Sequence, residues 1–147
     1  MTPPPANISL AASIALALSL WAFTFKAAVF PNHFWLPDAH PAAPTPVSAI
    51  LSGLVVNVGA YAIIRFFYTI LGWDSMKSIS SAVSSAAAIL VVLGGASALI
   101  ASALMLVQKD IKRTLAYSSI YNMGIVFAGI AIGTKLAIAA ALFHILN

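Results

Sequence analysis

Long apolar segments separated by short polar ones limit most strongly what this chain can fold into. A helix needs roughly 20 mostly apolar residues to cross about 30 Å of hydrocarbon, and it satisfies its own backbone hydrogen bonds there. The apolar stretches cover residues 7–30, 47–71, 82–107 and 114–134, and a fifth runs from 136 to the end. The sequence therefore predicts an all-α fold, a polytopic membrane bundle with four complete transmembrane helices and a cut fifth.

Composition excludes several classes of function. The chain is 62% hydrophobic and only 7% charged, outside the usual range of soluble domains, so we expect no water-exposed catalytic domain. A net charge of +4 is too sparse for a nucleic-acid surface. Without cysteine the chain cannot ligate an iron–sulfur cluster, and its three histidines are widely scattered, so we expect no cofactor in this chain and electron transfer in another polypeptide.

The segment QKDIKR, at 108–113, carries the strongest positive cluster and is predicted to be a cytoplasmic loop. Counting spans back from it places residues 31–46 on or toward the same side. Small residues crowd GGASALIASAL, at 94–104, which favours close approach of helix backbones in lipid.

Prolines interrupt the end of the first apolar stretch. Each proline removes an amide donor and disfavours helical geometry in the residue before it. We expect the first helix to be broken there; the prolines are Pro31, Pro37, Pro41, Pro44 and Pro46.

Lys26 lies just before this break, among apolar neighbours. A lysine at the centre of a membrane helix costs about 2.5–3.5 kcal/mol on insertion scales, and desolvation makes it able to release a proton near neutral pH. The alternative is a lysine that snorkels from a helix end to the interface. The sequence leaves both interpretations open.

Other polar residues share helix faces within the apolar stretches. Asn57 and Tyr61 are four residues apart, and His144 and Asn147 three apart. Each set indicates either a water path or hydrogen bonding between helices, and His144 is in addition a candidate proton carrier. A third set, in the fourth span, comprises Ser118, Tyr121 and Asn122. Arg65 is expected to snorkel to the interface.

His33, Asp38 and His40 form the pattern H-x4-D-x-H within the proline-rich segment. Zinc in an intramembrane hydrolase could use such ligands, but the intervening prolines impose no common helical face. We favour capping of the broken helix and predict no metal site.

Four segments together resemble one family: KAAVFPNHFWLPDAHPAAPTPVSAILSG, a GAY segment that ends in arginine, LVQKDIKRTLAYSSIYNMG, and ALFHILN. The chain resembles the antiporter-like membrane subunits of respiratory complex I, of Mrp-type Na+/H+ antiporters and of membrane-bound hydrogenases. The resemblance extends from about Ala12 to Asn147.

The resemblance implies a helical bundle in which broken helices expose buried charges to a hydrated path. Lys26 matches the family's lysine before the first break, which pairs with a glutamate on an earlier helix, and His144 matches a histidine of the central relay. It implies translocation of protons or Na+, with redox chemistry in partner subunits, in an energy-transducing membrane.

Two departures favour an alternative, a structural subunit that does not conduct. Asn57 stands where the family often has a lysine, and an amide cannot hold a proton. The chain has no glutamate at all. We therefore expect residues 1–147 to be a single membrane domain, a fragment or split part of a larger subunit, whose missing helices and glutamate come from another chain.

Overall fold

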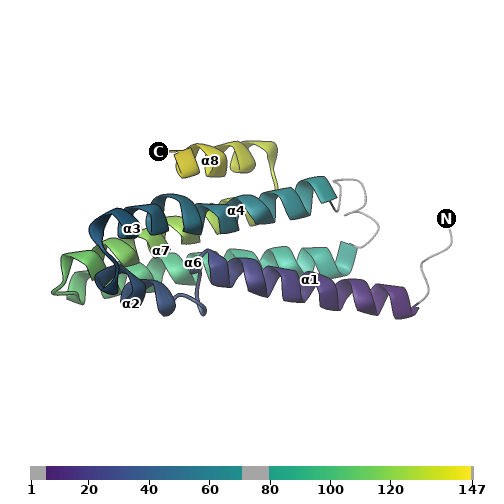
Figure 1. Cartoon of the computed structure of the whole chain (residues 1–147). Helices are drawn as coiled ribbons and strands as arrows, with labels where there is room; N and C mark the ends of the chain where they lie inside the picture. The colour runs from purple at the N-terminus through teal and green to yellow at the C-terminus, as the bar shows by residue number, and fades with distance from the viewer. Residues whose placement is uncertain (1–5, 71–79, 147) are drawn as a thin grey trace.

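The computed structural model describes residues 6–70 and 80–146, and within these ranges the regular structure is entirely helical, as predicted. Segments are named as in Figure 1. The α-helices are α1 (Ala6–Lys26), α2 (Trp35–Ala42), α3 (Thr45–Ile50), α4 (Val56–Ile64), α6 (Ser80–Val107), α7 (Ile111–Ile132) and α8 (Lys135–Leu146). Two π-helical segments, η1 (Leu51–Val55) and η2 (Arg65–Ile70), follow α3 and α4.

Three helical stretches are long and apolar enough to cross a membrane: Thr45–Ile64, Ser85–Val107 and Ile111–Ile132. They correspond to the second, third and fourth predicted spans. The apolar helical parts Ser13–Lys26 and Lys135–Leu146 are shorter among the described residues. Residues 1–5, and residues 71–79 between the second and third predicted spans, lie outside what the structure describes.

The first helix ends earlier than the prolines suggested. α1 stops at Lys26, and the backbone is not helical again until α2 begins at Trp35. Pro37 and Pro41 then lie inside α2. Pro37 is tolerated because the first turn of a helix has no internal partner for its amide. The non-helical segment, residues 27–34, is called the interruption below.

α6 and α7 form the principal helix pair of the molecule. Asp110 caps α7 by accepting a 2.9 Å hydrogen bond from the Lys112 amide, which defines the turn between the two helices. A β-carbon added to Gly94 would lie 2.6 Å from the carbonyl oxygen of Gly124, and the reverse distance is the same. The two backbones can therefore cross only because both positions lack a side chain.

α8 returns along α7 through a tight turn. Gly133 adopts φ 73°, the left-handed conformation that ends many helices, and Thr134 then accepts a 3.2 Å hydrogen bond from the Ala137 amide. Figure 1 shows α8 lying along the bundle, and α2 at the end of the bundle where α6 turns into α7.

The buried core joins α2, α4 and α7. Its fully buried side chains include Leu36 of α2, Ile63 of α4, and Ile120 and Phe127 of α7. The Tyr68 hydroxyl donates a 2.7 Å hydrogen bond to the carbonyl of Ile130, which ties η2 to α7.

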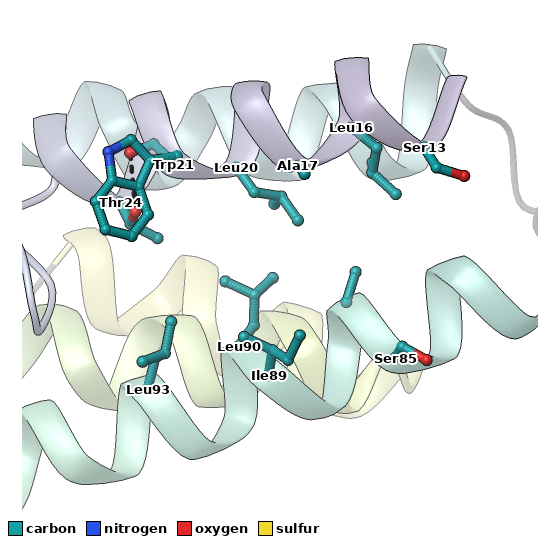
Figure 2. Close-up of a pocket in the computed structure, with 11 residues that line it drawn as sticks. Ser13, Leu16, Ala17, Leu20, Trp21, Thr24, Ser85, Ile89, Leu90 and Leu93 are labelled. Carbon is teal, nitrogen blue, oxygen red and sulfur yellow. Dashed lines mark hydrogen bonds between the residues drawn. The ribbon is translucent and has the colours of Figure 1, made fainter. Parts of the chain in front are cut away.

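α1 and α6 are separated by an apolar cavity of about 360 Å³ (Figure 2). None of its lining residues is titratable, so the cavity offers no side chain that could bind a proton. It is lined by Ser13, Leu16, Ala17, Leu20, Trp21, Thr24, Ser85, Ala86, Ile89, Leu90 and Leu93.

Candidate functional site

Lys26 is the last residue of α1, at the edge of the interruption. Its side chain is exposed on the surface of this chain, whereas Ala27, Ala28 and Val29, which follow it, are completely buried. Ala28 has φ 53°, which is unusual for a residue with a side chain. The backbone thus turns sharply into the core directly after Lys26.

The carbonyl groups at the C-terminal end of α1 accept hydrogen bonds from the interruption and from the first residue of α2. The Phe25 carbonyl accepts from the Ala28 amide at 3.1 Å and from the indole nitrogen of Trp35 at 2.9 Å. The Thr24 carbonyl accepts from the Val29 amide at 3.0 Å. Broken backbone in a membrane protein needs such partners, because an unsatisfied polar group in hydrocarbon is costly.

Two other helices hold the interruption in place. Ser97 of α6 is buried, and its hydroxyl accepts a 3.3 Å hydrogen bond from the Phe30 amide. A β-carbon added to Gly59 of α4 would lie 2.8 Å from the amide nitrogen of Ala27. Sequence reasoning missed both contacts, although the small-residue segment 94–104 contains Ser97.

Replacing Gly59 with alanine should therefore disturb the backbone next to Lys26. The clash is with backbone atoms, so α4 must move away, and overpacking of this kind destabilises by about 1–3 kcal/mol. Gly53→Ala is the matched control, since a β-carbon there meets nothing within 4 Å. Thermal unfolding of the purified protein in detergent should show a lower Tm for Gly59→Ala than for Gly53→Ala. Equal Tm values would contradict this account of the α1–α4 contact.

Asn57 lies two residues before Gly59 on the same helix. Its side-chain nitrogen donates a 2.8 Å hydrogen bond to the Gly53 carbonyl. Its side-chain oxygen is buried and has no hydrogen-bond partner among the described residues. The Tyr61 side chain is 54% exposed. The Arg65 side chain, at the start of η2, is also exposed.

His144 and Asn122 meet across the α7–α8 pair. The distance between His144 Nε2 and the side-chain oxygen of Asn122 is 3.3 Å. The sequence placed these two residues on separate polar faces and did not indicate that the faces pack together. Ser118 is partly exposed and Tyr121 is 38% exposed on α7. Asn147 lies outside the described residues.

Two basic residues in the first turn of α7, Lys112 and Arg113, contact α2 and its C-terminal cap. Arg113 forms a 2.9 Å ion pair with Asp38, and Lys112 Nζ donates a 2.9 Å hydrogen bond to the carbonyl of Ala43, the C-terminal cap of α2. A cation at a helix C-terminus is favourable because of the helix dipole. QKDIKR and the segment 31–46 therefore lie at the same end of the molecule, as the span count predicted.

His33 and His40 occupy different surroundings in this region. The His33 ring lies 5.5 Å from the Phe30 ring, and burial lowers its pKa. His40 is buried, and its Nδ1 is hydrogen-bonded to the Ser48 hydroxyl. With Asp38 paired to Arg113, the three residues do not converge on one point, and no metal-binding group of His, Cys, Asp or Glu occurs within residues 6–70 and 80–146.

Comparison with known proteins identifies a family that this chain matches. A family model described as NADH:quinone oxidoreductase/Mrp antiporter, transmembrane, matches residues 6–147. The chain is 42% identical over 132 residues to the hydrogenase-4 component F homolog of Methylacidiphilum infernorum (isolate V4), covering 90% of this chain and 26% of that protein. It is 34% identical over 144 residues to NADH-quinone oxidoreductase subunit N of Desulforudis audaxviator (strain MP104C), covering 98% of this chain and 28% of that protein.

Solved structures include a similar chain as well. It is that of the membrane-bound sulfane sulfur reductase, an archaeal respiratory membrane complex, and the match has a TM-score of 0.83 and 32% identity over 97% of this chain and 28% of the other. This chain thus spans about a quarter of the length of the curated relatives it matches. It belongs to the transmembrane family of NADH:quinone oxidoreductase subunits and Mrp antiporters.

Proposed function

We propose that this chain forms part of a membrane subunit that translocates protons or Na+ within a redox-driven pump or antiporter complex. The observation that carries the proposal is the position of Lys26, the last residue before an interruption of the helix, in a chain that matches this family over residues 6–147. A titratable side chain at a break in a membrane helix can contact water while its surroundings stay apolar.

The ion path would connect Lys26 with His144 through water and polar side chains. His144 already lies within hydrogen-bonding distance of Asn122, so the pair supplies a titratable ring and an amide that can orient water. Asn57 presents a buried oxygen that a water molecule could satisfy. A proton would pass Asn57 on water, since the amide cannot bind it.

The remaining parts of the proposal concern the host complex. Redox chemistry would take place in partner subunits, and this chain would hold no cofactor or metal. Residues 1–147 would be one membrane domain of a larger antiporter-like subunit, in contact with lipid and with membrane subunits that supply further helices and a glutamate for Lys26. The complex would lie in the energy-transducing membrane, with QKDIKR on the cytoplasmic side.

Substitution of His144 tests the relay. His144→Gln keeps a hydrogen-bonding group for Asn122 but cannot carry a proton, whereas His144→Ala removes both properties. Because a positioned acid–base group contributes about 10²–10⁴-fold to proton transfer, both variants should reduce ion flux per assembled complex at least about tenfold. Flux is measured in liposomes with a pH-sensitive dye. Normal flux with His144→Gln would contradict a relay through this residue.

One observation favours a second function, that of a structural subunit that does not conduct ions. Asn57 is neutral, and its amide nitrogen is engaged within its own helix, which suits a subunit that keeps the bundle geometry without conducting. In that case substitutions at His144 would lower the yield of assembled complex and leave flux per complex unchanged. Measuring assembly and flux on the same samples separates the two functions.

A further inference from the structure

His40 is enclosed at the junction of α2, α3 and α7. Its side chain is 2% exposed, and Nδ1 is hydrogen-bonded to the Ser48 hydroxyl of α3. Lys112 of α7 places its ammonium on the carbonyl of Ala43, three residues further along the chain. The hydrogen bond with Ser48 therefore fixes the orientation of the imidazole, and the surrounding residues shield it from solvent.

The other ring nitrogen of His40 has unused hydrogen-bonding capacity. Nε2 is buried and has no hydrogen-bond partner among residues 6–70 and 80–146. Leaving a buried polar atom unsatisfied costs about 1–3 kcal/mol, and buried waters commonly remove such a penalty. A water molecule can satisfy Nε2 in either tautomer, because it can both donate and accept a hydrogen bond.

We propose that Nε2 of His40 binds a buried water molecule and exchanges a proton with it, which makes the α2–α3–α7 junction a proton-exchange site at the QKDIKR end of the chain. The exchange part rests on the proposed function. In the tautomer whose Nδ1–H donates to the Ser48 hydroxyl, Nε2 carries a lone pair. A hydronium ion in the site then gives its proton to Nε2, leaving water and an imidazolium ion, and the reverse step returns the proton to water.

The surrounding charges oppose lasting protonation. α2 lies outside the three candidate membrane spans, and within it Asp38 is already paired to Arg113. α3 presents no titratable group. Burial, and next the positive charge of Lys112, lower the pKa of His40 below its ordinary value of 6.5. The imidazole is thus neutral at pH 7, and a proton that it takes up is readily released.

Two variants separate the nitrogen atoms of the ring. His40→Gln places an amide near the position of Nε2, so it can hold the water but cannot accept a proton. His40→Asn places its amide near Nδ1, so it can keep the Ser48 contact and loses the water-binding atom. In the assembled complex both should reduce ion flux at least about tenfold, by analogy with other positioned acid–base groups.

A high-resolution density map of the same complexes tests the water itself. We expect density beside Nε2 in the wild type and in His40→Gln, and its loss in His40→Asn. Absence of density at Nε2 in the wild type, or a protein side chain bonded there, would overturn the water site. Wild-type flux in both variants, alongside reduced flux in the His144 variants, would overturn the proton exchange and leave the proposed function intact.

Stability against pH gives a readout that does not depend on transport. Because the folded protein holds His40 neutral, its lowered pKa favours folding above about pH 6.5, and this contribution is lost as the pH falls from there through the folded pKa. His40→Gln should therefore lose less Tm in detergent between pH 7 and pH 5 than the wild type. Lys112→Met should also reduce that loss, since it removes a cause of the lowered pKa. Unchanged pH profiles in both variants would contradict the burial of a titrating His40.

Discussion

Replacing Lys26 with alanine should abolish ion translocation by the assembled complex. The complex should still assemble, and its partner subunits should still carry out redox turnover. The side chain is at the end of α1, where the backbone turns into the core, and residues 27–34 of the interruption include no lysine, arginine, aspartate or glutamate. Lys26→Arg should fail as well, because a guanidinium does not release its proton in the physiological range. Flux per complex in liposomes is the measurement, with assembly judged by gel filtration.

Lys135→Ala provides the matched control. Lys135 is also an exposed lysine at a helix terminus, the first residue of α8, but it adjoins the short turn between α7 and α8 rather than the interruption. Its removal should leave flux within about twofold of the wild type, as is usual for surface substitutions. Equal flux in wild type, Lys26→Ala and Lys135→Ala would remove Lys26 from the mechanism.

Replacing Gly94 with alanine should have the largest effect on stability. The added β-carbon would lie 2.6 Å from the Gly124 carbonyl oxygen and 2.8 Å from the Ala128 amide nitrogen. Both are backbone atoms, so no side chain can rotate away and α6 must separate from α7. We expect a loss of at least about 1–3 kcal/mol and a poorer yield of folded protein.

The adjacent glycine is the natural control for this substitution. A β-carbon on Gly95 meets nothing within 4 Å, and alanine is the better helix former by about 1 kcal/mol. Gly95→Ala should therefore keep or raise the Tm in detergent, and Gly94→Ala and Gly124→Ala should both lower it. A Tm for Gly94→Ala equal to that for Gly95→Ala would contradict the close crossing.

The sequence was sufficient for features that depend on local chemistry. Apolar length predicted the all-helical fold and the three helices that are long and apolar enough to cross a membrane. The four complete spans and a break caused by the prolines stay predictions. The residue at which α1 ends could not be predicted from the sequence. α1 ends at Lys26, and the segment after it is contacted by two residues of helices distant in sequence. Gly59 lies against Ala27, and the Ser97 hydroxyl accepts a hydrogen bond from the Phe30 amide.

The contacts between residues of different helices could not be predicted from the sequence. The spacing of His144 and the spacing of Asn122 each define a face on one helix, but only the Gly133–Thr134 turn brings the two faces together. QKDIKR indicated membrane orientation through its charge. Its contacts with Asp38 and Ala43 arise from the packing of α2 on α7, which short proline-containing segments do not reveal in advance.

The most direct test of ion translocation is the number of ions moved per catalytic turnover by the purified native complex that contains this chain. The complex is reconstituted in sealed liposomes, and internal pH or Na+ is followed together with turnover of its partner subunits. We predict ion movement that scales with turnover, disappears with an uncoupling ionophore and is lost in Lys26→Ala. Full turnover in sealed vesicles with no movement of either ion in the wild type would contradict the account.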